Sequence, residues 1–251
     1  MTPNTGPTFE NLVFDPTLYG LTALVTLVSL GAAILALRRR GSEPSRALGT
    51  GLVAIGYAII LGVAISLLAL VRAGGLGGVQ YLQIEFTAAY AGCATLMYGI
   101  DRVMFANGSG QRKRTLRGAL WSMFFVSLGI GFAYLLNPLT FMVTTVGGTQ
   151  HVAQESVFWL PPSVTLIAGA VGLPAIVRAN DKDITVRKHS LWLALFFIAI
   201  IAGVLKESNA IPSLGDPLVD MLVAFIPFTV GSLCILKSAT MLPRSRTLCV
   251  P

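Results

Sequence analysis

Seven apolar segments run through this chain, and their length and continuity constrain the fold more than any other feature. A helix needs about 20 apolar residues to cross about 30 Å of hydrocarbon, and it satisfies its own backbone hydrogen bonds there. Strands of a membrane barrel would alternate apolar and polar residues, whereas these segments are continuously apolar. The predicted spans are Leu18–Leu37, Ala47–Val71, Gln80–Phe105, Leu116–Leu136, Val157–Val177, Ser190–Leu205 and Pro217–Leu236.

The composition favours a membrane protein without a soluble domain. Hydrophobic residues make up 54% of the chain and charged residues 12%, against about 25% charged residues in soluble domains. The longest loop between predicted spans is Asn137–Ser156. The expected fold is an all-α, seven-transmembrane-helix bundle that forms a single domain over residues 1–251. Because the sixth span is short, its helix is expected to extend into flanking residues.

The lysines and arginines predict the orientation of this bundle. All but two of the 18 basic residues fall in the loops after spans 1, 3 and 5 or in the C-terminal tail, and the exceptions are Arg72 and Lys206. Loops rich in Lys and Arg stay in the cytoplasm. The N-terminus is therefore expected outside and the C-terminus in the cytoplasm of a multi-pass cell-membrane protein. The net charge of +7 then reflects topology and attraction to anionic lipid headgroups, not binding of nucleic acid.

Few ionisable residues are predicted inside the spans, where each costs about 3 kcal/mol or more at mid-depth. No lysine, histidine or carboxylate is expected at half depth, which argues against proton pumping and haem binding. Asp101 is expected to pair at the cytoplasmic interface with Arg102 or with the cluster Arg112–Arg114. His151 is predicted in an outer loop and His189 at the cytoplasmic start of span 6, so the two cannot share a metal ion. A non-enzymatic protein without a metal site is expected.

Three charged residues are expected at a similar depth near the outer ends of spans 3, 6 and 7. They form a predicted outer polar cluster of Glu85, Lys206 and Asp220. An ion pair that locks these helices together is the favoured interpretation. A binding site, a proton-release group and the gate of a transporter remain alternatives.

Aromatic and hydroxyl side chains gather in predicted spans 3, 5, 6 and 7. Two interpretations stay open for them: ordinary packing, or the lining of an apolar pocket that holds a retinoid, a carotenoid or a lipid without a covalent bond. The candidate pocket residues are Thr87, Tyr90, Trp159, Trp192, Phe196, Phe225 and Phe228.

Small residues recur four positions apart in three of the predicted spans. Such spacing lets helix backbones approach closely in lipid. Chance is the alternative, because Gly and Ala are abundant in this chain. The pairs are Ala58 with Gly62, Ala88 with Gly92, and Ala168 with Gly172.

The topology and three stretches of sequence resemble the microbial (type 1) rhodopsins. Met221–Ser238 resembles the last helix of that family, Leu191-Trp192 resembles the start of its sixth helix, and Val157–Trp159 resembles the aromatic opening of its fifth. The resemblance places the retinal-bearing lysine of the family on Phe228 and the acid one turn before it on Ala224.

In the third helix, the resemblance places the family's arginine and counter-ion acid near Ile84 and Thr87, with Glu85 as the nearby carboxylate. It therefore implies an opsin-like protein that has no covalent retinal.

Two functions follow as hypotheses. The first is a non-enzymatic, rhodopsin-like integral membrane protein that acts as a sensor, a scaffold or a partner subunit. Its partners would be the lipid bilayer and other membrane proteins or a second copy of the chain. The alternative is a small-solute or ion transporter that uses Glu85 and Asp220 as an outer gate. A membrane enzyme that acts on lipids ranks below both.

Overall fold

The computed structural model describes residues 16–39, 43–72, 78–105, 111–136, 143–146, 149–152, 163, 165–174, 183–207 and 217–243. Six α-helices of 23 to 29 residues lie in this part of the chain. Each coincides with one of the predicted spans. Their bounds are α1 Pro16–Arg38, α2 Pro44–Arg72, α3 Gly78–Met104, α4 Gln111–Leu136, α8 Ile184–Glu207 and α9 Pro217–Met241.

The fifth predicted span, Val157–Val177, coincides with a shorter described helical segment. Residues 165–174 are helical and include a π-helical turn, η2, over Ala168–Gly172. Gly172 lies against α3, where an added Cβ would be 2.8 Å from the Met104 methyl carbon. The contact is with a side chain, so close backbone approach at the predicted pair Ala168 and Gly172 stays a prediction.

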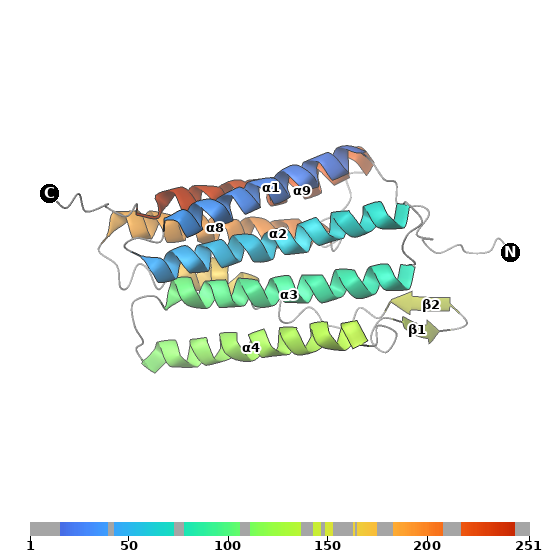
Figure 1. Cartoon of the computed structure of the whole chain (residues 1–251), viewed down its shortest axis with the longest axis horizontal. Helices are drawn as coiled ribbons and strands as arrows, with labels where there is room; N and C mark the ends of the chain where they lie inside the picture. The colour runs from blue at the N-terminus through green and yellow to red at the C-terminus, as the bar shows by residue number, and fades with distance from the viewer. Residues whose placement is uncertain are drawn as a thin grey trace.

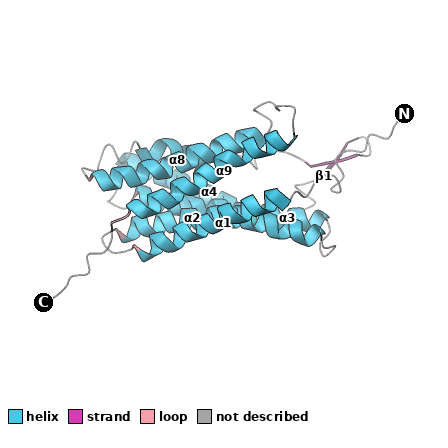
Figure 2. Cartoon of the chain, turned by 90° about the horizontal axis from the view of Figure 1, so that it is seen from above, coloured by secondary structure: helices cyan, strands magenta, loops and turns pink. Residues whose placement is uncertain are grey.

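The helices pack in chain order, and the last returns to the first. Helix α2 lies between α1 and α3, α4 packs on α3, α8 packs on α9 and on η2, and α9 packs on α1 (Figures 1 and 2). The long helices run side by side with nearly parallel axes (Figure 1). Helix α4 therefore lies at the edge of the described bundle.

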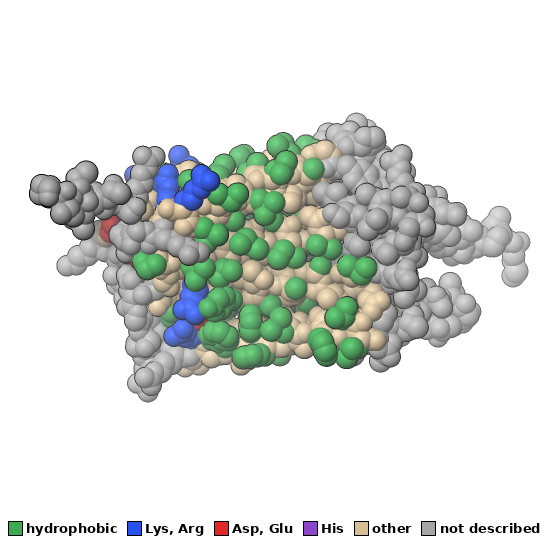
Figure 3. Space-filling model, viewed as in Figure 1, with side chains coloured by type: hydrophobic (Ala, Val, Ile, Leu, Met, Phe, Trp, Pro, Cys, Tyr) green, Lys and Arg blue, Asp and Glu red, His purple; other side chains and the backbone are tan. Residues whose placement is uncertain are grey.

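Polar contacts show which helix ends meet. Arg39, after α1, donates to the carbonyls of Thr240 and Leu242 at the end of α9. Ser45, at the start of α2, donates to the Arg102 carbonyl near the end of α3, at 3.0 Å. The end of the bundle that holds these contacts is called the basic end below, because Lys and Arg side chains gather there (Figure 3).

Helices α2 and α3 approach so closely that their backbones are almost in contact at two levels. A Cβ added to Gly49 of α2 would lie 2.6 Å from the carbonyl oxygen of Gly99 in α3. One added to Gly56 of α2 would lie 2.7 Å from the carbonyl oxygen of Gly92 in α3. In each helix the two glycines are seven residues apart. We call these four glycines the glycine seam. Gly92 is the one residue of the seam that belongs to the small-residue pairs predicted in spans 2 and 3. The glycines of the seam are spaced by seven residues, whereas the predicted pairs were spaced by four.

A two-stranded antiparallel hairpin interrupts the otherwise helical fold. Strands β1, Val143–Val146, and β2, Thr149–Val152, pair with Val143 opposite Val152. Figure 1 shows them near the end of the bundle where α3 begins. The fold is helical as predicted, and the hairpin falls within the predicted loop Asn137–Ser156. Val and Thr favour strands, and the Gly-Gly pair between them suits a two-residue hairpin turn.

The surface of the bundle is apolar along its length. Hydrophobic side chains are spread over the middle of the face in Figure 3. Leu27 and Phe132, for example, are 66% and 60% exposed. Four described helical stretches are long and apolar enough to cross a membrane, and Phe225–Met241 is a shorter apolar stretch. These features indicate a membrane protein. The four stretches are Gly20–Arg38, Pro44–Val63, Thr115–Leu136 and Ile184–Leu205.

Candidate functional site

Three of the predicted pocket residues lie together in the middle of the bundle. Phe196 and Phe228 are buried beside Tyr57 of α2, whose hydroxyl donates to the Phe228 carbonyl at 3.1 Å. The Tyr57 and Phe196 rings meet edge to face at 5.0 Å between centroids. Phe225 meets Phe228 at 6.2 Å. Tyr57 thus connects Phe196 with Phe228, and Phe225 contacts Phe228 on the same helix.

Aromatic rings in this part of the core pack directly on the backbone of glycine residues. An added Cβ at Gly203 would lie 2.8 Å from the Phe228 ring, and one at Gly169 would clash with Phe197, which is fully buried. Trp192 is half-buried against the same core. These contacts favour packing over an apolar pocket as the role of Phe196 and Phe228.

The other predicted pocket residues lie elsewhere. Thr87 donates to the Gln83 carbonyl of its own helix at 2.7 Å, and Tyr90 stacks on Tyr134 of α4 at 5.9 Å between centroids. Tyr90 and Tyr134 form a second, smaller buried cluster between α3 and α4. The predicted pocket is thus divided between two separate clusters. Trp159 lies outside the described residues.

For the three residues of the predicted outer polar cluster, the structure describes the backbone positions alone. Lys206 lies near the end of α8 and Asp220 near the start of α9, two helices that pack side by side. Glu85 lies in the first third of α3, a helix that packs on α2 and α4. The three side chains are outside the described ones, so their mutual ion pairing stays a prediction.

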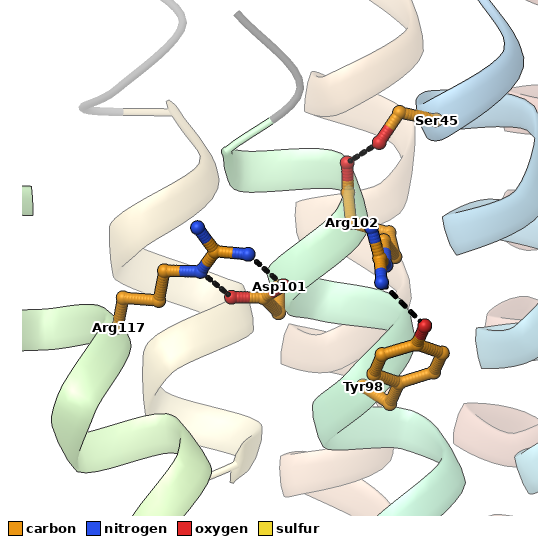
Figure 4. A network of polar contacts seen from close by, with 5 residues as sticks. All are labelled: Ser45, Tyr98, Asp101, Arg102 and Arg117. Carbon is orange, nitrogen blue, oxygen red and sulfur yellow. Dashed lines mark hydrogen bonds and ion pairs between the residues drawn. The ribbon is translucent and has the colours of Figure 1, made fainter. Parts of the chain in front are cut away.

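The most developed polar site is at the basic end, between α3 and α4 (Figure 4). Asp101 accepts two hydrogen bonds from Arg117, at 2.7 Å from Nε and 3.2 Å from Nη2. The Asp101 side chain is only 3% exposed, whereas Arg117 is 41% exposed. Such two-point contacts between guanidinium and carboxylate are the stronger and more directional ion pairs.

Asp101 was expected to pair with basic residues, and it does, but its partner is not Arg102. Adjacent helical residues point in directions about 100° apart, because the helix has 3.6 residues per turn. Arg102 therefore points toward Tyr98, one turn earlier on α3, whereas Asp101 faces α4. The side chains of the predicted cluster Arg112–Arg114 lie outside the described ones.

Arg102 is held by an aromatic ring and not by a carboxylate. Its Nη2 donates to the Tyr98 hydroxyl at 2.5 Å, and its guanidinium carbon lies 4.8 Å from the centroid of the same ring. A cation over an aromatic face is stabilised by the ring quadrupole. The Arg102 Nε is buried and has no hydrogen-bond partner among the described residues.

An aromatic wall continues from Tyr98 toward the middle of the membrane. Trp121 meets Tyr98 edge to face at 5.7 Å, and Phe124 meets Trp121 at 5.2 Å. Between α3 and α4 there is a shallow, open depression in the surface. We call it the α3–α4 groove. It is lined by Met97, Tyr98, Asp101, Leu120, Trp121 and Phe124.

A second polar cluster joins α2, α8 and α9 at the basic end. The Nε2 atom of His189 and the Thr50 hydroxyl share a hydrogen bond of 2.8 Å, and the Ser238 hydroxyl donates to the His189 carbonyl at 2.9 Å. All three residues are at most 1% exposed. The His189 Nδ1 is buried without a partner among the described residues.

His189 lies within α8 near its start, where the sequence placed it at the beginning of span 6. Helix α8 begins at Ile184, well before the predicted start at Ser190, so His189 lies within an apolar stretch long enough to span a membrane. Asp183 marks this start, because its carboxylate accepts a hydrogen bond of 2.7 Å from the Thr185 amide. An aspartate before a helix is a common N-cap, and this signal was present in the sequence.

Comparisons with protein-family models, curated proteins and solved structures find no match to this chain. Within the described residues, no three or more His, Cys, Asp or Glu side chains are close enough to hold a metal ion. The hydrogen bonds of Asp101 with Arg117, and of His189 with Thr50 and Ser238, join helices at the basic end, whereas that of Arg102 with Tyr98 lies within α3. The exposed guanidinium of Arg117 can also bind an anion.

Proposed function

We propose that the protein is an opsin-like cell-membrane protein that crosses the membrane seven times and forms no Schiff base with retinal. It acts on other membrane proteins as a sensor, a scaffold or a partner subunit, and it is not an enzyme. The observation that carries the proposal is the environment of Phe228. The resemblance to microbial rhodopsins puts the chromophore lysine at this position.

The packing of Phe228 supports a bundle that works without a bound chromophore there. Its ring fills the space beside Gly203, and its carbonyl accepts the Tyr57 hydroxyl. Phe228 is 7% exposed and Phe196 is fully buried. A phenylalanine has no amine to form an imine, and the surrounding side chains already occupy its neighbourhood.

The positions of two helix ends support seven crossings. Gln83, near the start of α3, donates to the Leu135 carbonyl, so α4 ends at the end of the bundle opposite the basic end. The contact between His189 and Thr50 puts the start of α8 at the basic end. The chain between α4 and α8 then has to return along the bundle, and the helical residues 165–174 suit that return.

The distribution of charge supports the proposed orientation. Arg39, Arg102, Arg117 and Lys237 come from four different helix ends, yet all lie at the basic end. Figure 3 shows Lys and Arg side chains gathered there. Lys and Arg are retained on the cytoplasmic side, so this end faces the cytoplasm and the N-terminus lies outside.

The centre of the bundle favours a packing role over transport. Transporters place substrate sites near the middle of the membrane, commonly at broken helices. The described residues at the middle of α2, α8 and α9 are Tyr57, Phe196 and Phe228, and they contact one another directly or through a backbone hydrogen bond. Several polar contacts that join helices, those of Ser45, Arg117 and Ser238 among them, lie at the basic end, where a cytoplasmic partner would meet them.

Incubation with retinal is expected to leave no covalent retinal on the protein. Borohydride reduction would fix any imine as a stable retinyl amine, and intact-mass measurement would detect it. Phe228→Lys alone is expected to form little adduct, because Ala224 and Thr87 put no acid beside a buried protonated imine. A retinyl mass on the unmodified protein would contradict the proposal and favour a photoreceptor.

Cysteine labelling is expected to confirm the orientation. In a variant without the three natural cysteines, Ser42→Cys and Ser109→Cys should be protected from a membrane-impermeant maleimide in intact cells. Thr149→Cys should react, because the hairpin lies at the end opposite the basic end. All three should react after the membrane is made permeable. Labelling of Ser42→Cys in intact cells would reverse the orientation.

A further inference from the structure

We propose that the α3–α4 groove binds an anionic phospholipid, with the phosphate at Arg117 and Arg102 and an acyl chain along the aromatic wall. This lipid site requires only that the basic end of the bundle lies at a membrane surface. Which of the two leaflets supplies the lipid depends on the orientation proposed above. A reversed orientation would move the site to the other leaflet without removing it.

Arg117 and Arg102 bond Asp101 and Tyr98, which line the groove, and within the described part of the chain only Arg117 of the two has a carboxylate partner. Asp101 is engaged by Nε and Nη2 of Arg117, and Arg102 bonds a neutral phenol. Two guanidiniums therefore surround one described carboxylate. A phosphodiester carries one negative charge, and its oxygens suit guanidinium N–H groups.

Arg117 can bind a phosphate without leaving Asp101. Its ion pair uses Nε and Nη2, which leaves the Nη1 hydrogens for a second anion, and the side chain is 41% exposed. The buried carboxylate holds the guanidinium in place. A headgroup would therefore meet a guanidinium whose geometry is already set, which reduces the entropy lost on binding.

The lining of the groove suits an acyl chain. Below the two arginines it is formed by Met97, Leu120, Trp121 and Phe124, and it is open on one side. Trp and Tyr are enriched at the level of lipid headgroups, and Trp121 and Tyr98 stand beside the charged mouth. Phe125, the residue after Phe124, is 63% exposed on the apolar surface. A chain lying in the groove would thus continue into bulk lipid.

The tryptophan in the groove permits a direct measurement. The protein has three tryptophans, so Trp159→Phe with Trp192→Phe leaves Trp121 as the only indole. This protein is placed in phosphatidylcholine vesicles that contain either brominated phosphatidylglycerol or brominated phosphatidylcholine. Bromine quenches indole fluorescence at short range. The anionic lipid is expected to occupy the groove about five-fold more than the zwitterionic lipid, the preference typical of one basic residue near an anionic lipid.

Matched arginine variants separate this site from general surface charge. Arg102→Gln should abolish most of the preference and leave the Asp101–Arg117 pair intact, whereas Arg102→Lys should keep much of it. Arg38→Gln removes one charge from the exposed end of α1 at the same end of the bundle, and it should change the preference little.

Three outcomes would overturn the proposal. Equal quenching by both brominated lipids would show that the groove does not select an anionic headgroup. Equal losses in Arg102→Gln and Arg38→Gln would show diffuse attraction to the membrane surface. Protection of Trp121 from both lipids would show that another protein segment covers the groove.

Discussion

Replacing Arg117 with methionine is expected to destabilise the protein by about 3 kcal/mol, the lower part of the range for breaking a buried ion pair. The reason is the burial of Asp101, whose side chain is 3% exposed and accepts both of its described ion-pair hydrogen bonds from Arg117. Without Arg117 the buried carboxylate loses both of its described ion-pair hydrogen bonds. The free energy of unfolding in mixed detergent micelles would measure the loss.

A double variant tests whether the pair itself is responsible. Adding Asp101→Asn to Arg117→Met removes the stranded charge and should recover a large part of the lost stability. Arg38→Met is the matched control, because Arg38 is an exposed arginine at the same end of the bundle. Strictly additive effects of Asp101→Asn and Arg117→Met would show that the two groups do not stabilise each other.

Alanine substitutions in the glycine seam are expected to destabilise the contact between α2 and α3 by about 1–3 kcal/mol each, the usual cost of overpacking. At Gly56 the new methyl group would meet the Gly92 carbonyl oxygen at 2.7 Å. Backbone atoms cannot rotate away as a side chain can, so the two helices must separate. Gly56→Leu should be worse than Gly56→Ala.

Glycines on open faces provide the controls for the seam. An added Cβ at Gly118 or Gly129 of α4 has no atom within 4 Å, so alanine there should be neutral or stabilising by up to about 1 kcal/mol through higher helix propensity. Gly56→Ala combined with Gly92→Ala should cost less than the sum of the two, because the first change already separates the helices. Equal stability of Gly56→Ala and Gly129→Ala would contradict the close approach.

Helix positions were predictable from the sequence because burial in lipid requires long apolar runs. The predicted second span, Ala47–Val71, lies within α2, Pro44–Arg72. The sixth was predicted to be short and to extend into flanking residues, and α8 does begin upstream at Ile184, where Asp183 caps it. The hairpin β1–β2 was missed, since its two strands are only four residues each and long apolar runs dominated the pattern.

Partners of individual side chains were less predictable. Asp101 was correctly expected to meet a basic residue, but four arginines or lysines were near enough in sequence to compete with Arg117. Only the antiparallel packing of α4 on α3 selects Arg117. Thr87 and Phe228 were assigned to one candidate pocket, yet they belong to different contacts of the bundle.

The sequence by itself determined the apolar spans, the segregation of Lys and Arg and the absence of a lysine at position 228. These properties belong to individual segments of the chain. The effect of the bilayer on each segment does not depend on how the segment packs against other helices. Tertiary structure decided that α2 and α3 meet at glycines, that Asp101 binds Arg117, and that His189 joins α2 and α9 to α8. Each of these depends on the rotation and axial register of neighbouring helices, and packing between side chains sets both.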